Sequence, residues 1–183
     1  MDDLFLCGLK HSGKTYIGQY LAVCWGWKWI DADDLTKTGI PEGMTIRSFY
    51  KAQGAATFQN VERTQMSAFL SVSHPRTVVS MGGGAADNQG LLELCRLYGA
   101  LVYLYVPEDV LFRRILADGL PPFLDPDDPK GSFHRLFFRR NALYGKACQI
   151  VLHLPDSPTV QQTAAWCGER LEGYKDGTQQ FRI

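Results

Sequence analysis

The residues best suited to chemistry lie near the amino end of the chain. The run Gly8-Leu-Lys-His-Ser-Gly-Lys14-Thr15 satisfies the phosphate-loop pattern G-x(4)-G-K-[ST] in full. In such a loop, backbone N–H groups and the positive end of the next helix surround phosphate oxygens. We expect Lys14 to bridge the β- and γ-phosphates of a nucleotide and Thr15 to hold Mg²⁺ through its hydroxyl group.

The neighbours of this loop support the same interpretation. An apolar run of strand length precedes it at residues 4–7, and a helical pattern follows at residues 14–25, as a phosphate loop requires. Gly8, Ser12 and Gly13 are therefore expected to contact the nucleotide together with the lysine and threonine that follow them. The alternative is an accidental glycine-lysine turn.

Three carboxylates end the next apolar run, in the stretch Trp-Ile-Asp31-Ala-Asp33-Asp34. If Asp31 and Asp33 continue the strand, they project to the same side, because side chains in a strand alternate with a period of two. One aspartate could then hold a Mg²⁺-bound water while the other takes the proton of a hydroxyl group. The alternative is that Asp33 or Asp34 caps a helix that runs toward Thr38.

Three successive glycines, Gly82, Gly83 and Gly84, follow the third apolar run. They remove every side chain from that strand end, so that backbone N–H groups can approach a ligand closely. A flexible turn is the alternative.

The elements that must position these residues alternate along the chain. Apolar runs of strand length lie at residues 4–7, 27–30, 77–81, 101–106 and 149–153. Helical patterns lie at residues 14–25, 45–72 in two pieces broken near Gly54, 89–98, 107–117, 132–146 and 158–171. This alternation predicts an α/β fold with three layers, in which helices cover both faces of a five-stranded parallel sheet. Ligands bind such sheets at the carboxyl ends of the strands.

No repeat or linker divides the chain, so residues 1–183 are expected to form a single domain. Residues 118–131 carry four prolines and two glycines without a helix or strand signal. A structureless segment of this length in a compact domain is usually a lid or a binding loop. The tail at residues 173–183 is polar and is expected to be loosely held.

The composition limits the class of partner. Nineteen basic and nineteen acidic side chains cancel, which disfavours binding to nucleic acid or to an anionic membrane surface. The five cysteines form no C-x-x-C pair and no metal-site spacing, and are typical of a reducing compartment. Without a basic amino-terminal leader or a long apolar stretch, the expectation is a cytoplasmic protein.

Taken together, these motifs resemble the shikimate kinase family, a small P-loop, nucleoside-monophosphate-kinase-like family. The resemblance covers about residues 4–171 and includes Arg140-Asn-Ala-Leu-Tyr144, which is similar to the family's Arg-x-Pro-Leu-Tyr. It implies transfer of the ATP γ-phosphate to the 3-hydroxyl of shikimate, a step of aromatic amino acid biosynthesis, with Mg²⁺ as cofactor. It also implies a small-molecule substrate and a monomeric protein.

The resemblance gives roles to residues of the acceptor site. It implies that Asp33 binds the acceptor hydroxyl and acts as base, while Asp31 orients Mg²⁺ water beside Thr15. The three glycines at residues 82–84 would line the acceptor ring. Arg140 would pair with the acceptor carboxylate and sense phosphate, which makes it a catalytic residue together with Lys14 and Asp33.

The same resemblance places the adenine ring and the lid. Arg113 or Arg114 on one side and Pro158 on the other lie where the family encloses adenine. The proline-rich segment at residues 118–131 falls where the family has its ATP lid.

The chain departs from the family at the carboxylate clamp. The family has Gly-Glu-x-x-Phe-Arg-x-x-Glu, whereas this chain reads Gly54-Ala-Ala-Thr-Phe58-Gln59-Asn-Val-Glu62. The arginine that would clamp the carboxylate is thus Gln59, still expected at the acceptor site. A charge-assisted contact contributes roughly 1.5 to 3 kcal/mol, so its loss weakens carboxylate binding by about one to two orders of magnitude.

Arg63 lies one helical turn after Gln59. It either reaches into the site in place of the missing arginine or pairs only with solvent and its own neighbours. Arg47 is a further candidate.

The lid and the phosphate loop hold two more departures. Where the family has Arg-Pro-Leu-Leu, this chain has Pro121-Pro-Phe-Leu124, and no basic residue lies between residues 118 and 129. A lid arginine neutralises charge on the transferred phosphoryl group, and Lys130 or Arg135 could replace it only if the lid folds differently. His11 stands where the family usually has glycine, and either crowds the phosphate or faces outward.

Three hypotheses follow from this pattern. The chain is a shikimate kinase that tolerates the changes, a kinase of the same fold with another hydroxylated acceptor, or a nucleotide-binding protein with little kinase activity and a protein partner. Retention of Lys14, Thr15, Asp31 and Asp33 argues against the third hypothesis, and Gln59 argues for the second.

Overall fold

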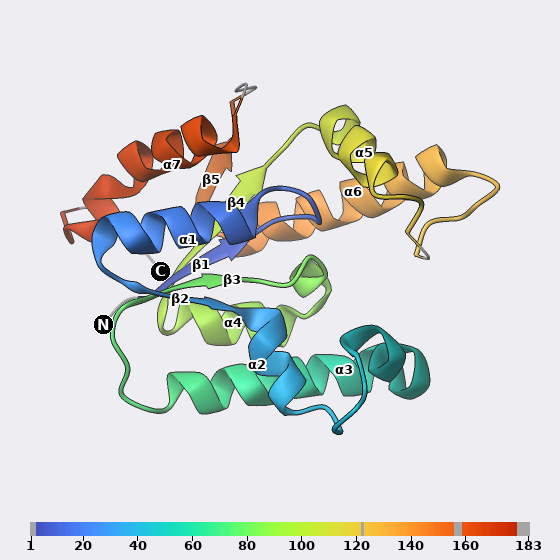
Figure 1. The fold of residues 1–183 in the computed structure, drawn as a ribbon, viewed down its shortest axis with the longest axis horizontal. Coiled ribbons are helices and arrows are strands. Elements are labelled where there is room, and N and C mark those ends of the chain that lie inside the picture. Colours follow the sequence, from blue (N-terminus) through green and yellow to red (C-terminus); the bar gives the residue numbers. More distant parts are fainter. Residues whose placement is uncertain (1–2, 122, 156–158, 179–183) are drawn as a thin grey trace.

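The computed structural model of the chain describes residues 3–121, 123–155 and 159–178. Five parallel strands form one sheet in the order β2-β3-β1-β4-β5 (Figure 1). The strands are β1 (Asp3–Cys7), β2 (Lys28–Asp31), β3 (Thr77–Ser80), β4 (Gly99–Tyr105) and β5 (Ile150–His153). The predicted three-layer α/β fold with a five-stranded parallel sheet is confirmed.

The described helices correspond closely to the predicted ones. They are α1 (Lys14–Trp25), α2 (Ala32–Thr38), α3 (Ile46–Leu70), α4 (Gln89–Arg96), α5 (Glu108–Ala117), α6 (Pro129–Ala147) and α7 (Val160–Lys175). The expected break in the long helix is present, because Gly54 has φ 77° and ψ 174° inside α3, a conformation that L side chains rarely adopt. The helix α2 ends at Thr38 and matches the alternative given for the acidic run, a capped helix toward that residue. A 3₁₀ turn, η1 (Ala85–Asp87), was not among the predicted helices.

The sheet separates two hydrophobic cores, and alternate residues of β1 feed each of them. Leu4 and Leu6 pack on the side of α1 and α7, which lie together on one face of the sheet (Figure 1). Phe5 and Cys7 pack on the opposite side, where α3, α4 and α6 supply the partners. Helices therefore cover both faces, and the carboxyl ends of the strands remain open for a site.

The carboxyl end of α7 is held more firmly than its polar sequence suggests. The helix continues to Lys175, beyond the expected start of a loose tail at residue 173. The hydroxyl group of Tyr174 donates a hydrogen bond to the Asp3 carbonyl (2.7 Å) and accepts one from the Ala100 N–H (3.1 Å). These bonds anchor the last turn of α7 to β1 and β4.

No helix in the described part of the chain is both long enough and apolar enough to cross a bilayer.

Candidate active site

The phosphate loop joins β1 to α1, as its sequence predicts. Gly13 caps α1 with φ 90°, and the ammonium group of Lys14 donates hydrogen bonds to the carbonyls of Gly8 and Leu9, both at 2.9 Å. The Ser12 hydroxyl is buried, the residue being 1% exposed, and it has no hydrogen-bond partner among the described residues. A buried hydroxyl without a partner, in a loop that leads into the amino end of a helix, fits a phosphate oxygen.

Burial lowers the pKa of Lys14 to about 8, and the nearby carboxylates of Asp33 and Asp31 partly oppose this effect. The lysine is thus a cation at neutral pH, held in a place where an anionic ligand would be strongly favoured.

The His11 side chain is largely buried, with 19% exposure, and lies against the end of α5. Its backbone is left-handed, with φ 66°, which explains why glycine suits this position. Its ring nitrogen Nε2 lies 3.4 Å from the carboxylate of Asp118, at the end of α5. Its carbonyl accepts a hydrogen bond of 3.1 Å from Arg114. These two contacts link the phosphate loop to α5.

A cavity of about 290 Å³ opens beside the phosphate loop. It brings Ser12 and Gly13 together with Arg113 and Arg114 of α5. The remaining walls come from α1 and from the segments that follow β4 and β5. These lining residues are Ile17, Val106, Pro107, Asp109, Val110, Leu154, Pro155, Val160 and Thr163. Both arginines thus line the same cavity as the phosphate loop. Pro158, expected on the opposite side, lies outside the described residues.

The two aspartates do not continue one strand, and this expectation was wrong. β2 ends at Asp31, whose carboxylate accepts a hydrogen bond from the Asp33 N–H (2.9 Å) and so caps α2. Asp33 lies in the first turn of that helix. The cap is Asp31 rather than Asp33 or Asp34, because a capping carboxylate bonds N–H groups two or three residues ahead of it.

The helix turn nevertheless aims Asp33 at the site. Although the residue as a whole is exposed, the pKa of Asp33 is raised, first because its carboxyl group is withdrawn from water and second because Asp31 is near, while Lys14 acts in the opposite direction. A carboxylate with a raised pKa is suited to accepting a proton.

The triple glycine is the point at which the separate motifs meet. A methyl group placed on Gly82 would lie 2.9 Å from the Asp33 carboxylate, and one on Gly83 would lie 3.2 Å from the backbone nitrogen of Lys10 in the phosphate loop. On Gly84, it would lie 3.5 Å from the Arg140 guanidinium. The absence of side chains therefore allows these three groups to approach one loop.

Glu62 of α3 belongs to this site, although it was not assigned a role from the sequence. Its carboxylate accepts a hydrogen bond of 3.0 Å from Asn88 and would lie 3.7 Å from a methyl group on Gly82. Burial raises the pKa of Glu62 to about 7, the Asn88 hydrogen bond lowers it, and Asp33 raises it. The signal that could have found it is its place in the family pattern, where Glu62 matches.

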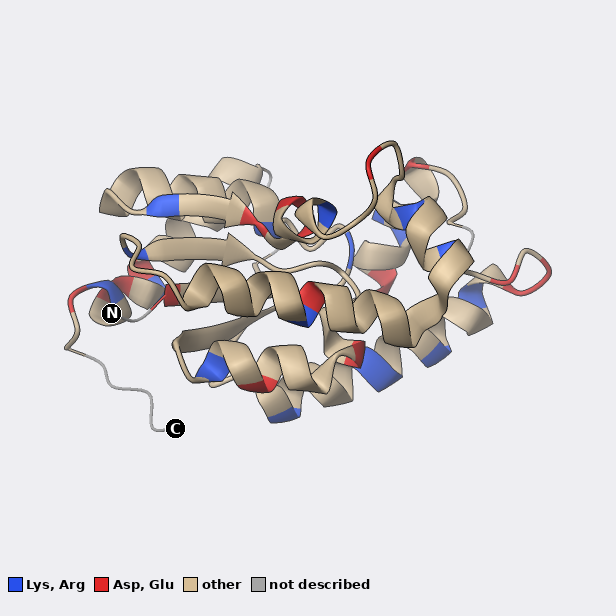
Figure 2. Cartoon of the chain, turned by 90° about the horizontal axis from the view of Figure 1, so that it is seen from below, with Lys and Arg blue, Asp and Glu red and all other residues tan. Residues whose placement is uncertain are grey.

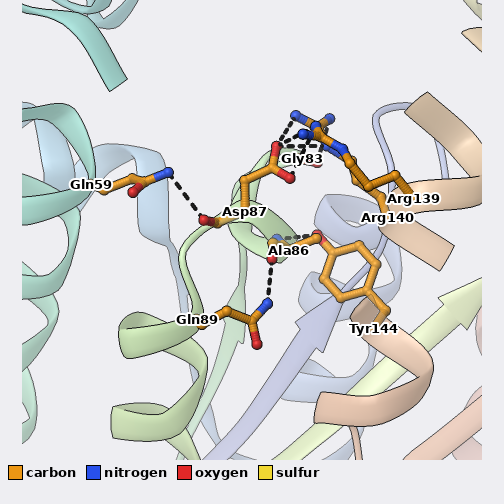
Figure 3. A network of polar contacts seen from close by, with 8 residues as sticks. All are labelled: Gln59, Gly83, Ala86, Asp87, Gln89, Arg139, Arg140 and Tyr144. Carbon is orange, nitrogen blue, oxygen red and sulfur yellow. Dashed lines mark hydrogen bonds and ion pairs between the residues drawn. The ribbon is translucent and has the colours of Figure 1, made fainter. Parts of the chain in front are cut away.

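Arg140 lies beside the triple glycine and is already paired. Its guanidinium donates to the carbonyl of Gly83 (3.2 Å) and to one oxygen of Asp87 (2.8 and 3.1 Å). The Asp87 carboxylate also pairs with Arg139 at 3.1 Å, and Figure 3 shows both arginines reaching it from α6. Four residues later, the Tyr144 hydroxyl accepts a hydrogen bond from the Ala86 N–H (3.2 Å). The Arg140–Tyr144 motif of α6 thus fixes the glycine loop and the turn that follows it through hydrogen bonds to Gly83 and Ala86.

Gln59 and Arg63 occupy different surroundings. The Gln59 amide donates to the backbone carbonyl of Asp87 (3.1 Å; Figure 3), which places it at the glycine loop. Arg63 is exposed, donates to Asn60 (3.2 Å), and lies against Gly90 of α4. Its contacts are therefore with α3 and α4, as expected if it does not replace the missing arginine.

The loop that leads into α6 is acidic, whereas α5 and α6 carry many basic residues. Lysines and arginines gather on the side of the molecule that carries α5 and α6, and acidic residues on the loop that leads into α6 (Figure 2). Arg135 is 3.3 Å from the Asp128 carboxylate, which caps α6, and Lys130 is exposed. Leu124, 4% exposed, anchors the segment in the core.

The geometry resembles that of a known family, and comparison with known proteins supports this. The family model described as shikimate kinase matches residues 10–170.

The chain belongs to the shikimate kinase family.

Relatives of this family agree over most of the chain. The shikimate kinase of Synechococcus sp. (strain RCC307) is 36% identical over 149 residues, which cover 79% of this chain and 72% of that protein. The shikimate kinase of Bacteroides thetaiotaomicron has a solved structure that is 26% identical and covers 93% of this chain and 98% of that one, with a TM-score of 0.76.

A further solved structure supports the fold. The shikimate kinase of Acinetobacter baumannii in complex with shikimate has a TM-score of 0.80 at 22% identity, and the match covers 98% of this chain and 95% of that one. Membership in the shikimate kinase family makes the chain an ATP-dependent phosphotransferase with an alcohol acceptor.

Proposed function

We propose that this shikimate kinase family member transfers the γ-phosphate of ATP to the 3-hydroxyl of shikimate. The observation that carries the proposal is the contact of one glycine loop with three groups: Asp33, the phosphate loop at Lys10, and Arg140. A hydroxylated ring lying on that loop would be within reach of a base, a phosphate donor and a guanidinium at once.

The residues of the phosphate loop are suited to hold and neutralise the triphosphate. The buried Ser12 hydroxyl has no hydrogen-bond partner among the described residues and is available to a phosphate oxygen. The Lys14 ammonium group has one N–H left beyond its bonds to the carbonyls of Gly8 and Leu9, and it supplies the positive charge. We assign the adenine ring to the cavity beside Arg113 and Arg114, with Pro158 on its other side.

The exposed Thr15 hydroxyl and the Asp31 carboxylate offer the oxygen ligands that Mg²⁺ takes in such sites. When bound, Mg²⁺ would neutralise charge on the β- and γ-phosphate oxygens.

The transfer itself needs one base and one leaving group. The acceptor oxygen attacks the γ-phosphorus, the bond from that phosphorus to the oxygen bridging to the β-phosphate breaks, and ADP leaves with the bridging oxygen. Asp33 takes the hydroxyl proton, a role to which its raised pKa suits it. Arg140, beside Gly83 and Gly84, would face the acceptor's carboxylate.

A second acceptor class is favoured by a specific observation. Gln59 brings no charge to the site, and the Arg140 guanidinium already pairs with Asp87 at 2.8 Å. An acceptor without a carboxylate, such as a neutral cyclic polyol, would lose less binding free energy in this site than shikimate would, because it has no charge that needs a free cation.

The test is ADP release in a coupled assay with ATP, Mg²⁺ and saturating shikimate. We expect wild-type protein to turn over and Asp33→Asn to lose at least about a hundredfold in kcat, since a positioned base contributes about 10² to 10⁴. ADP affinity, measured by calorimetry, is expected to change by less than about twofold, because Asp33 faces the acceptor rather than the nucleotide. Asp34→Asn is the control, since Asp34 pairs with Lys37 at the surface.

Two results would contradict these assignments. A loss of nucleotide affinity in Asp33→Asn would make Asp33 a metal ligand or a structural residue. Turnover of a neutral polyol without turnover of shikimate would favour the second acceptor class.

A further inference from the structure

The acceptor end of the site contains a carboxylate of its own. Asp87 lies at the end of η1, is partly buried with its side chain 24% exposed, and faces two arginines of α6. Its Oδ2 accepts hydrogen bonds from Nε and Nη2 of Arg140 (3.1 and 2.8 Å) and from Nη2 of Arg139 (3.1 Å). The Nε–Nη2 edge of the Arg140 guanidinium, one of the two that can bind a carboxylate through paired N–H groups, is therefore occupied by a protein carboxylate.

The backbone fixes Asp87 in this position. The Gln59 amide donates to its carbonyl, and the Asp87 N–H donates to the Gly84 carbonyl (2.9 Å). Asn88, the next residue, caps α4 and donates to both Gln59 and Glu62. Figure 3 shows Asp87 between Gln59 on one side and the arginine pair on the other. The backbone of Asp87 is thus held on both sides, which keeps its side chain beside the two arginines.

The charges at this end of the site follow from these contacts. Two guanidinium groups face one carboxylate, and the Gln59 amide adds no charge. The Arg140 side chain is 18% exposed and that of Arg139 is 59% exposed, so the more buried of the two cations is the one that Asp87 engages most closely. A ligand carboxylate must therefore share Arg140 with Asp87, displace Asp87 from it, or bind the solvent-exposed Arg139, where charge pairs contribute little.

We propose that Asp87 is a specificity-determining residue, which occupies Arg140 in place of an acceptor carboxylate and makes the enzyme discriminate weakly between an acidic acceptor and its neutral ester. The inference rests on the proposed function, since it assigns the acceptor's carboxylate end to Arg140. Asp87 thus affects how the charged group of the acceptor is bound, whereas Lys14 and Asp33 serve the transfer of the phosphoryl group.

The experiment compares kcat/KM for shikimate with kcat/KM for shikimate methyl ester. In wild type we expect the acid-to-ester ratio to lie below about ten. In Asp87→Asn the ratio is expected to rise about tenfold, because the guanidinium then offers its charge-assisted hydrogen bonds to the ligand. The ester's own kcat/KM is expected to stay within about threefold of wild type. Asp176→Asn at the exposed end of α7 is the matched control and leaves the ratio unchanged.

A second substitution protects the test against a folding defect. Asp87→Ser also removes the carboxylate and must change the ratio in the same direction, and urea unfolding identifies a variant that does not fold. If the ratio stays within twofold of wild type, or if neither variant folds, Asp87 is only structural and the inference is overturned. If wild type phosphorylates neither the acid nor the ester, the proposed function fails and the inference fails with it. If wild type turns over shikimate but the acid-to-ester ratio is unchanged in the Asp87 variants, the inference fails and the proposed function stands.

Discussion

The substitution Glu62→Gln tests whether the acceptor site carries a buried charge that destabilises the fold. Glu62 is 9% exposed, and burial raises its pKa from 4.5 to about 7. Because one pKa unit corresponds to about 1.4 kcal/mol, ionised Glu62 costs the folded state about 3 kcal/mol. Glutamine keeps the shape and the oxygen that accepts from Asn88, but it cannot ionise.

The sign of the effect follows from proton binding. Between pH 4.5 and 7, the folded protein keeps the Glu62 proton while the unfolded chain has lost it. The wild type therefore loses stability as the pH rises through this interval, and the loss is complete above pH 7. The advantage of Glu62→Gln in free energy of unfolding is expected to grow from below about 1 kcal/mol at pH 5 to about 3 kcal/mol at pH 8.

The assay is urea unfolding of both proteins without nucleotide, from pH 5 to pH 8 at constant ionic strength. Glu93→Gln on the exposed face of α4 is the matched control and should show no such trend. An advantage of equal size at pH 5 and pH 8, or a variant that is less stable than wild type at pH 8, would refute the reasoning, because Glu62 would then carry no buried charge.

Two further predictions concern the phosphate loop and the glycine loop. Because the pKa of Lys14 is about 8 and bound phosphate restores its charge, ADP affinity measured by calorimetry should fall by about tenfold between pH 7 and pH 9; a constant affinity would contradict this. Gly82→Ala places a methyl group 2.9 Å from the Asp33 carboxylate, so kcat should fall at least about tenfold with ADP affinity unchanged. Gly145→Ala, where the added methyl group meets nothing within 4 Å, should be neutral, and equal kcat values for the two variants would remove the steric argument.

The sequence predicted the elements well because their signals are local. Every strand of the sheet lies within two residues of its predicted ends, since continuous apolar runs between helical patterns identify buried parallel strands. The break at Gly54 was equally readable, because glycine is the residue that a left-handed φ demands.

The parts that sequence could not supply depend on contacts between distant segments. The seven-residue α2 has too few apolar positions to show a helical period, so Asp33 was expected on a strand. Asp87 carries no motif of its own, and only the docking of α6 reveals that its carboxylate meets Arg140. The direction of His11 likewise depends on where α5 ends.

The division of the interior into two cores sets an order of assembly during synthesis. On the side of α3, α4 and α6, the last buried residue of the core is Tyr144, whereas the core beside α1 needs Ala164, Cys167 and Leu171 of α7. Ribosomes add about 5 to 20 residues per second, so the core beside α1 stays incomplete for a few seconds after the last buried residue of the opposite core has been made. Helix α1, which follows the phosphate loop, is therefore among the first helices to be made and the last to be buried. Because α7 lines the cavity beside that loop, a nascent chain completes its nucleotide site only when α7 docks.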